Sequence, residues 1–319
     1  MVLAAAVVVT LMPFATRRLT QLGVVDVPAA RSSHAWPTPR GAGLVTGPAL
    51  GIALVLGWDP ITVGLSAVAL AATLLGSLED LRGIGVGPRI AGQVAIGGLF
   101  LAFSWWTGTP LTIPGTVVML VFIVGYTNAF NFMDGINGIS ASTTAVIGVA
   151  YVAVAQLRGV PDLRVVGAVL AVTALCFLPF NFPTARIFLG DSGSYSFGAV
   201  IACTAVAGWR AGIPLDAMLS PLAIYLGDTG TVVAKRLIKG ESVTAPHRSH
   251  AYQRVARLRS SHAQSVAVVL ICTVTTAGMG LAALDAGVGA RIALDCAIAA
   301  VVALYLQLPK FLAGARHLG

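Results

Sequence analysis

Charged residues are scarce in this sequence. Asp, Glu, Lys and Arg make up 10% of the 319 residues, whereas hydrophobic residues make up 57%. A soluble globular domain carries about 25% charged residues, so this composition excludes an ordinary soluble domain. No low-complexity tract or internal repeat interrupts the apolar pattern. The sequence therefore predicts an integral membrane protein that crosses the bilayer many times.

Cysteine is also scarce. The four cysteines all lie inside apolar runs, and no pair has the spacing of metal ligands; they are Cys176, Cys203, Cys272 and Cys296. Cysteines in such runs behave as small, packed, reduced side chains. The sequence therefore indicates neither a disulfide framework nor a zinc site.

Long apolar runs, in contrast, are abundant. A helix that crosses the hydrocarbon core needs about 20 apolar residues. We expect an all-α fold, a single polytopic helical bundle of about 11 transmembrane helices over residues 1–319. The first run is interpreted as a retained span, because it lacks the basic flank of a signal peptide. The expected spans are roughly 1–15, 44–57, 60–78, 90–107, 114–132, 139–157, 164–180, 195–209, 213–234, 265–284 and 290–308.

Basic residues are unevenly distributed over the two sides of such a bundle. The long loops, which all fall on one side, carry most of the 20 Lys and Arg residues. Because basic loops stay inside, we expect the N-terminus outside and the C-terminus and long loops in the cytoplasm. This topology accounts for the net charge of +8. Membrane lipids are therefore expected partners, and nucleic acid is not.

Four polar side chains follow one another at three-residue intervals where two expected spans meet. They are Asn128, Asn131, Asp134 and Asn137. Residues three apart share one face of a helix, and this face would offer amides and a carboxylate to a nucleotide or a hydrated metal ion. The alternative is a helix end that is capped by Asn and Asp and stopped by glycine.

A pair of adjacent carboxylates, Glu79 and Asp80, ends another expected span. Such a pair can bind Mg²⁺, and mutual repulsion raises one pKa, which suits a general base. The alternative is a pair of interfacial charges that Arg82 and Arg89 neutralise.

The segment 190–194, Gly-Asp-Ser-Gly-Ser, opens a further expected span. Its backbone N–H groups can hold a phosphate, and Asp191 can hold a metal ion. The alternative is a helix cap, which the same residues would also make.

Basic side chains gather in two of the long loops. Guanidinium and imidazole groups pair with phosphate or pyrophosphate, although ordinary cytoplasmic loops are also basic. The prolines and glycines of the first loop lead us to expect no regular structure over residues 31–43. The residues are Arg31, His34 and Arg40 in the first loop, and His247, Arg248 and His250 in the second.

All five segments fall on the cytoplasmic side of the expected topology. Their chemistry is of one kind, because carboxylates suit a metal ion, Arg and His suit phosphates, and Asn suits a base or a sugar. We therefore expect a cytoplasmic site for a charged phosphate compound together with Mg²⁺.

These segments, in this order, resemble the polyprenyl-phosphate N-acetylhexosamine-1-phosphate transferases. That superfamily includes phospho-MurNAc-pentapeptide translocase and the enzymes that initiate O-antigen and teichoic acid synthesis. The resemblance covers about residues 16–265. Pro-Thr-Pro-Arg-Gly and His-Arg-Ser-His-Ala-Tyr-Gln are most similar to the O-antigen-initiating subgroup.

The resemblance implies an activity and a location. A sugar-1-phosphate would pass from a UDP-N-acetylhexosamine to undecaprenyl phosphate, leaving a lipid-linked sugar diphosphate and UMP. The enzyme would lie in the bacterial inner (plasma) membrane with its active site facing the cytoplasm. The donor sugar and the glycan pathway stay open, and a homodimer is compatible with such a bundle.

The resemblance also implies roles for individual residues. The catalytic residues would be Asp80, Glu79 and Asp134. The ligands of Mg²⁺, for which Mn²⁺ can substitute, would be Asp191 and Asn131. The nucleotide sugar would contact Asn128, Asn137, Asp134, Gly190 and Ser192. The phosphates would contact His247, Arg248, His250, Arg40 and Arg31.

Two positions depart from the family pattern. The family usually has Asp where this chain has Glu79 and Asn137. Glu79 lengthens one carboxylate arm by a methylene group, and Asn137 brings no charge. The competing interpretation is a secondary transporter of an anionic solute or lipid. It predicts ionisable groups in the middle of spans, where this sequence has almost none.

Overall fold

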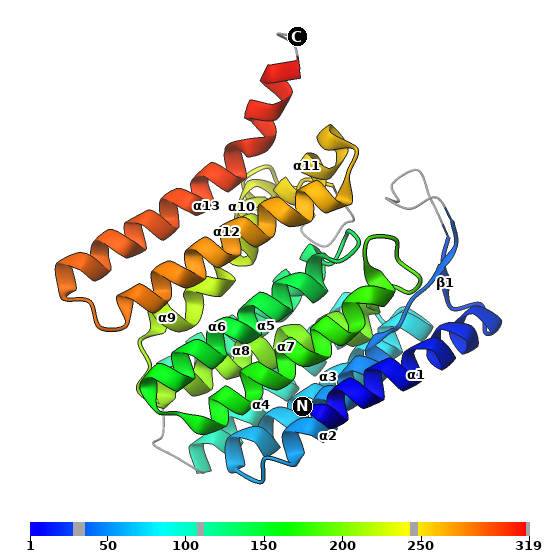
Figure 1. The fold of residues 1–319 in the computed structure, drawn as a ribbon, viewed down its shortest axis with the longest axis horizontal. Helices are drawn as coiled ribbons and strands as arrows, with labels where there is room; N and C mark the ends of the chain where they lie inside the picture. The colour runs from blue at the N-terminus through cyan, green and yellow to red at the C-terminus, as the bar shows by residue number, and fades with distance from the viewer. Residues whose placement is uncertain (28–35, 107–111, 243–247, 317–319) are drawn as a thin grey trace.

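The computed structural model describes residues 1–27, 36–106, 112–242 and 248–316. Its regular structure is almost entirely helical, which confirms the expected all-α bundle (Figure 1). The helices are α1 (Val2–Gln21), α2 (Gly43–Val55), α3 (Pro60–Arg82), α4 (Val86–Trp106), α5 (Ile113–Met133), α6 (Ile139–Arg158), α7 (Pro161–Asn181), α8 (Gly190–Arg210), α9 (Leu215–Leu219), the 3₁₀ turn η1 (Ser220–Leu222), α10 (Ala223–Ile238), α11 (Ala251–Arg259), α12 (His262–Ala283) and α13 (Val288–Arg316).

Nine helical segments in the described part of the chain are long and apolar enough to cross a membrane. They coincide with nine of the expected spans, and α9, η1 and α10 together form one of them, Leu215–Ile238. The other two expected spans are also helices, but α2 has only 13 residues and α8 begins with the polar sequence Gly-Asp-Ser-Gly-Ser. The protein is therefore a multi-pass membrane protein with two atypical helices in its bundle.

Helix α8 runs through the centre of the bundle, with α2, α3 and α5 packed against it (Figure 1). Every residue from 192 to 208 is buried, so protein surrounds this helix. Its 21 residues span about 30 Å at 1.5 Å per residue, which matches the hydrocarbon thickness. Polar residues are tolerated in α8 because neighbouring helices can satisfy them.

Glycines allow α2 and α3 to approach the beginning of α8 at backbone distance. A methyl group on Gly43 of α2 would overlap the backbone of Gly193, and one on Gly76 of α3 would overlap the carbonyl group of Asp191. Close-packed backbones cannot shift without cost. The position of the Gly-Asp-Ser-Gly-Ser segment is therefore fixed by its neighbours.

The expectation of no regular structure over residues 31–43 is wrong at positions 38 and 39, which form a strand, and at Gly43, where α2 begins; residues 31–35 lie outside the described residues. Strand β1 (Val25–Asp26) pairs antiparallel with β2 (Thr38–Pro39), with Val25 opposite Pro39. A proline is tolerated here because both strands of a two-stranded ribbon are edge strands.

The segment after β2 joins the loop that leads into α8. Arg40 forms an isolated parallel bridge with Phe188. The N–H of Phe188 donates to the carbonyl of Pro39 at 2.8 Å, and the N–H of Gly41 donates to the carbonyl of Phe188 at 3.1 Å. The first long loop and the loop before α8 are thus held together by backbone hydrogen bonds.

Helices α10, α11 and α13 meet at a buried carboxylate, that of Asp228. Its two oxygens accept the N–H of Ala251 at 3.1 and 3.0 Å, and the hydroxyl of Tyr305 donates to it at 2.7 Å. His250 Nδ1 lies 3.1 Å from it. Because an unpaired buried carboxylate is costly, these contacts fix three helices relative to one another.

We predict that Gly43→Ala lowers the midpoint of thermal unfolding, because the added methyl group forces α2 away from α8. Overpacking of this kind costs about 1–3 kcal/mol. The measurement is thermal unfolding of the detergent-solubilised protein.

Gly125→Ala in α5 is the matched control, because nothing lies within 4 Å of its methyl position. Replacing a helical glycine by alanine there gains about 1 kcal/mol of helix propensity. A midpoint for G43A equal to that of G125A would contradict the close packing of α2 on α8.

Candidate functional site

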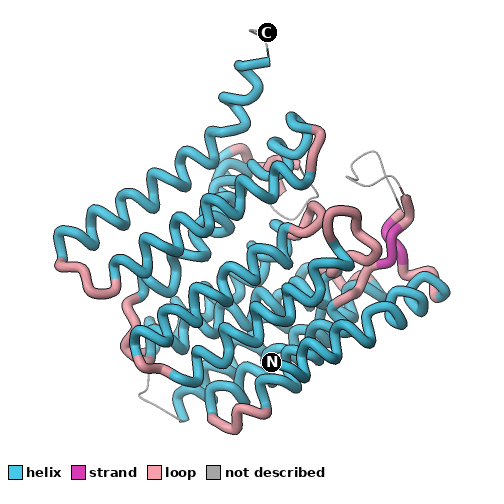
Figure 2. Tube along the Cα trace, in the orientation of Figure 1, coloured by secondary structure: helices cyan, strands magenta, loops and turns pink. Residues whose placement is uncertain are grey.

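The sequence-predicted residues collect at the end of the bundle where α3 and α5 end and α8 begins. At this end the loop 134–138 contacts the loop 182–189, which in turn lies beside the strand pair β1–β2 (Figure 2). Three helix termini and two loops therefore contribute to one region.

Asp80, near the end of α3, holds the beginning of α8. Its Oδ1 accepts the N–H of Asp191 and its Oδ2 accepts the N–H of Ser192, both at 3.0 Å. A carboxylate at a helix N-terminus satisfies unpaired N–H groups and the helix dipole. Arg40 reaches the same turn, and its guanidinium donates to the backbone carbonyl of Asp80 at 3.1 Å. Asp80 therefore positions Asp191.

Asp191 and Asn131 face each other across the interface of α5 and α8. Asn131 Nδ2 donates to Asp191 Oδ1 at 2.5 Å and to the hydroxyl of Ser194 at 2.9 Å. The structure thus brings together the two residues that were expected to hold a metal ion, although they lie 60 residues apart in the sequence.

Glu79 points in a different direction from its neighbour Asp80. Its carboxylate lies 3.6 Å from the guanidinium of Arg89 on α4, and both side chains are largely buried. Adjacent residues on a helix are about 100° apart, so the acidic pair does not act as one unit. Of the two alternatives for this pair, neutralisation by Arg89 applies to Glu79.

The prediction that Asn128, Asn131, Asp134 and Asn137 share one helical face is wrong. Helix α5 ends at Met133, and Asp134 is its C-cap. Asn128 also faces a different neighbour, because its amide donates to Gln93 Oε1 on α4 at 2.5 Å. Because the helix ends before Asp134, the motif is divided between α5, where Asn128 faces α4 and Asn131 faces α8, and the loop 134–138.

Asp134 lies in the enclosed region between these elements. Removal from water raises the pKa of its carboxyl to about 7, and the nearby charges of Asp191 and Asp80 add to this rise. A carboxyl group with a pKa near neutrality can donate or accept a proton under physiological conditions.

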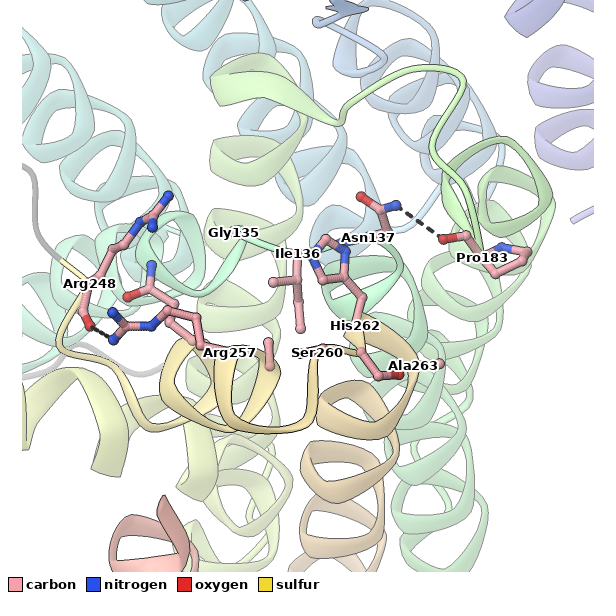
Figure 3. Close-up of a pocket in the computed structure, with 12 residues that line it drawn as sticks. Gly135, Ile136, Asn137, Pro183, Arg248, Arg257, Ser260, His262 and Ala263 are labelled. Carbon is pink, nitrogen blue, oxygen red and sulfur yellow. Dashed lines mark hydrogen bonds between the residues drawn. The ribbon is translucent and has the colours of Figure 1, made fainter. Parts of the chain in front are cut away.

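A cavity of about 600 Å³ opens beside the 134–138 loop, between that loop and the junction of α11 and α12 (Figure 3). Most of its polar lining comes from side chains that can form several hydrogen bonds each. They are Asn137, Arg248, Gln253, Arg257, Ser260, Ser261 and His262. A cavity of this size with convergent polar groups is typical of a small-molecule site.

Asn137 is held on both sides in this cavity wall (Figure 3). Its side-chain amide donates to the carbonyl of Pro183 at 3.1 Å, and its backbone N–H donates to Nδ1 of His262 at 3.3 Å. The next residue, Gly138, donates its N–H to Asn181 Oδ1 at 2.7 Å. No motif spacing in the sequence connects His262 to Asn137, because the two residues lie 125 positions apart.

The basic residues of the second loop have different surroundings. Arg248 lines the cavity, and its carbonyl accepts a hydrogen bond from Arg257 at 3.1 Å. His250 is 2% exposed and contacts Asp228, so part of its ring is committed to the junction of α10 and α11. The expected phosphate ligands Arg31 and His247 lie outside the described residues.

Two residues of the Gly-Asp-Ser-Gly-Ser segment pack inside the protein. Gly190 has φ +75°, and a methyl group there would lie 2.7 Å from Asp80 Oδ2 and 2.8 Å from the N of Gly41. The side chain of Ser192 is completely buried. Gly190 and Ser192 therefore support the site through their packing inside the protein.

The donor set around Asp191 fits a hydrated divalent cation. In the described part of the chain, no three or more His, Cys, Asp or Glu side chains are close enough together to hold a metal ion. Mg²⁺ does not require such a cage, because it usually binds one or two carboxylates together with water and substrate phosphates. Asp191 supplies such a carboxylate, and the side chains of Asn131 and Ser194 lie beside it, with the Asn131 amide nitrogen donating to both.

Comparison with known proteins gives a consistent result. The model of the family described as "Glycosyl transferase family 4" matches residues 62–209. The chain is 30% identical over 292 residues to the "Probable undecaprenyl-phosphate N-acetylglucosaminyl 1-phosphate transferase" of Bacillus subtilis, an alignment that covers 83% of this chain and 78% of the relative.

Two other relatives carry related names. The "Decaprenyl-phosphate N-acetylglucosaminephosphotransferase" of Mycolicibacterium smegmatis is 29% identical, over 79% of this chain and 73% of the relative. The "Phospho-N-acetylmuramoyl-pentapeptide-transferase" of Geobacillus kaustophilus is 33% identical, over 59% of this chain and 60% of the relative. With the family model and the long alignment to the Bacillus protein, these similarities show that the chain belongs to glycosyl transferase family 4, the polyprenyl-phosphate N-acetylhexosamine-1-phosphate transferase superfamily.

Proposed function

We propose that the protein transfers N-acetylhexosamine-1-phosphate from a UDP-sugar to undecaprenyl phosphate. The products are undecaprenyl-diphospho-sugar and UMP, and the reaction is the first membrane step of a cell-surface glycan such as O-antigen or teichoic acid. The observation that carries this proposal is the grouping of Asp80, Asp134 and Asp191, in which Asp134 directly precedes the residues 135–137 that line a cavity together with Arg248 and Arg257. The names of the relatives support the same reaction class.

The cavity of about 600 Å³ is the proposed site of the nucleotide sugar. Guanidinium groups pair with phosphate oxygens through two parallel hydrogen bonds, which suits Arg248 and Arg257 to the diphosphate. Gln253 and His262, which line the same cavity, are the proposed contacts of the base or the sugar. Asn137 helps to form the wall of the cavity, because its side-chain amide donates a hydrogen bond to the carbonyl of Pro183.

Asp191 and Asn131 are the proposed ligands of Mg²⁺, and Mn²⁺ shares the preference for oxygen ligands. When bound, the ion would neutralise negative charge on the diphosphate. Asp80 keeps Asp191 in place through the backbone N–H groups at the start of α8.

Asp134 is the proposed group that accepts a proton from, or orients, the lipid phosphate. In this reaction an oxygen of undecaprenyl phosphate attacks the β-phosphorus of the UDP-sugar, and the bond from that phosphorus to the bridging oxygen breaks. The bridging oxygen leaves with UMP. A pKa of about 7 for Asp134 is matched to proton transfer at neutral pH.

The proposed location is the bacterial inner membrane, with this end of the bundle facing the cytoplasm. The excess of Lys and Arg in the loops at this end supports that orientation. It would also place the cavity where cytoplasmic UDP-sugars can reach it.

The function is tested by UMP release from purified, detergent-solubilised protein supplied with undecaprenyl phosphate, Mg²⁺ and a panel of UDP-N-acetylhexosamines. We predict lipid-dependent release with at least one donor. We further predict that Asp191→Asn and Asp134→Asn each lower kcat by about 100-fold or more. The first variant loses stabilisation of charge in the transition state and the second loses proton transfer, and each of these contributes about that factor to the rate.

Asp285→Asn is the matched control, since the Asp285 side chain is 85% exposed and pairs with Arg158 at 3.1 Å. It should retain the parental rate. Thermal unfolding and gel filtration check that each variant is folded. Parental turnover by folded D191N and D134N would remove both residues from the proposed chemistry.

We predict that Arg248→Gln raises KM for the UDP-sugar by about 10- to 100-fold, because a hydrogen bond to a charged group contributes about 1.5–3 kcal/mol. The comparison is with Arg164→Gln, which removes an exposed arginine on α7 whose guanidinium donates to Gln156 Oε1 on α6. Equal KM values for the two variants would mean that the diphosphate binds away from Arg248.

A further inference from the structure

A second, smaller cavity of about 110 Å³ lies between α10, α11 and α13. It shares no lining residue with the larger cavity. Most of its lining is charged or hydroxylated. The residues are Asp228, Thr231, Val232, Lys235, Arg236, Lys239, Glu241, Ser249, Ala251, Arg254 and Leu306.

Positive charge predominates in this cavity, where four cations face two carboxylates. Both carboxylates already have partners. Asp228 accepts hydrogen bonds from Ala251 and Tyr305, and Glu241 pairs with Arg236 at 3.3 Å. Asp228 is fully buried, whereas Lys235 and Lys239 are exposed.

Four cations and two carboxylates leave the lining with a formal net charge of +2, and three of the cations have no direct partner among the described residues. Within the described residues, the side chains of Lys235, Lys239 and Arg254 have no hydrogen bond or ion pair. Lys235 lies in the last turn of α10, Lys239 is the C-cap of that helix and Arg254 lies on α11, so the three cations converge on one small space. Such an arrangement favours an anionic group.

The cavity also lies at the boundary between apolar surface and water. Next to the lysines, Leu237 is 64% and Ile238 is 86% exposed, and on α13 Leu304 is 65% and Phe311 is 63% exposed. Of the membrane-spanning part of α13, only 11% is buried inside the protein. Exposed apolar side chains beside lysines are typical of the level where lipid headgroups meet acyl chains.

We propose that this cavity binds the phosphate of an anionic phospholipid whose acyl chains lie along α13. Lys235, Lys239 and Arg254 contact the phosphate, and the hydroxyls of Thr231 and Ser249 complete the set. The bound headgroup joins α10 to α11, the helix that supplies Gln253 and Arg257 to the larger cavity. This proposal does not depend on the transferase reaction.

The test is native mass spectrometry of the detergent-solubilised protein, titrated with phosphatidylglycerol or with phosphatidylcholine of the same acyl chains. The parent protein should bind phosphatidylglycerol more tightly. Lys235→Gln/Lys239→Gln should bind it about 30-fold more weakly, because each lysine near an anionic lipid contributes about fivefold. Lys235→Arg/Lys239→Arg should retain the affinity, which separates lost charge from a folding defect.

Arg17→Gln/Arg18→Gln is the control for charge alone, since it removes two exposed cations from α1. It should bind phosphatidylglycerol like the parent. Equal losses in the two glutamine double variants would overturn the proposal in favour of diffuse surface charge. Displacement of the lipid by millimolar inorganic phosphate would overturn it as well.

Discussion

The site of this protein depends on the contact between one carboxylate and the first turn of a central helix. Asp80 accepts two N–H groups at the start of α8, in a place where α2 and α3 touch the α8 backbone through Gly43 and Gly76. The direction of Asp191 follows from that contact. Its neighbour Asn131 can then bridge to it from α5. A shift of α8 by a fraction of a turn would separate the acidic groups that the proposed chemistry needs.

The same arrangement occurs a second time, at the beginning of α11. There Asp228, another buried carboxylate from a neighbouring helix, accepts the first N–H of the helix. Both helix starts carry residues that line or orient the site, Asp191 in one case and Gln253 in the other. Because unpaired N–H groups at a helix end must be satisfied, a carboxylate from another helix fixes position and satisfies the backbone at once. His250 belongs to this second junction, which explains why it is buried.

The sequence was sufficient for the architecture and for the chemical class of the site. A single apolar run of this length can satisfy its backbone hydrogen bonds in a bilayer by forming a helix. Every expected span is indeed a helix. The sequence did not predict the directions in which individual side chains point. Asn128 turns to Gln93 and Glu79 to Arg89, because their partners come from α4, and helical periodicity says nothing about neighbouring helices. Similarly, the pairing of Asn137 with His262 spans 125 residues, a separation that no local motif encodes.

The two-strand ribbon and the bridge from Arg40 to Phe188 have a consequence for how the protein is made. Residues 38–41 leave the ribosome long before residues 186–189. Their pairing with β1 can form early, whereas the hydrogen bonds that Pro39 and Gly41 make with Phe188 form only when the later segment arrives. Since chains emerge from the N-terminus onward, helices α1 to α7 can enter the membrane while this end of the bundle is still incomplete. Insertion of α8 is then the event that closes it, and nascent chains that stop before residue 189 lack the backbone frame around Asp80.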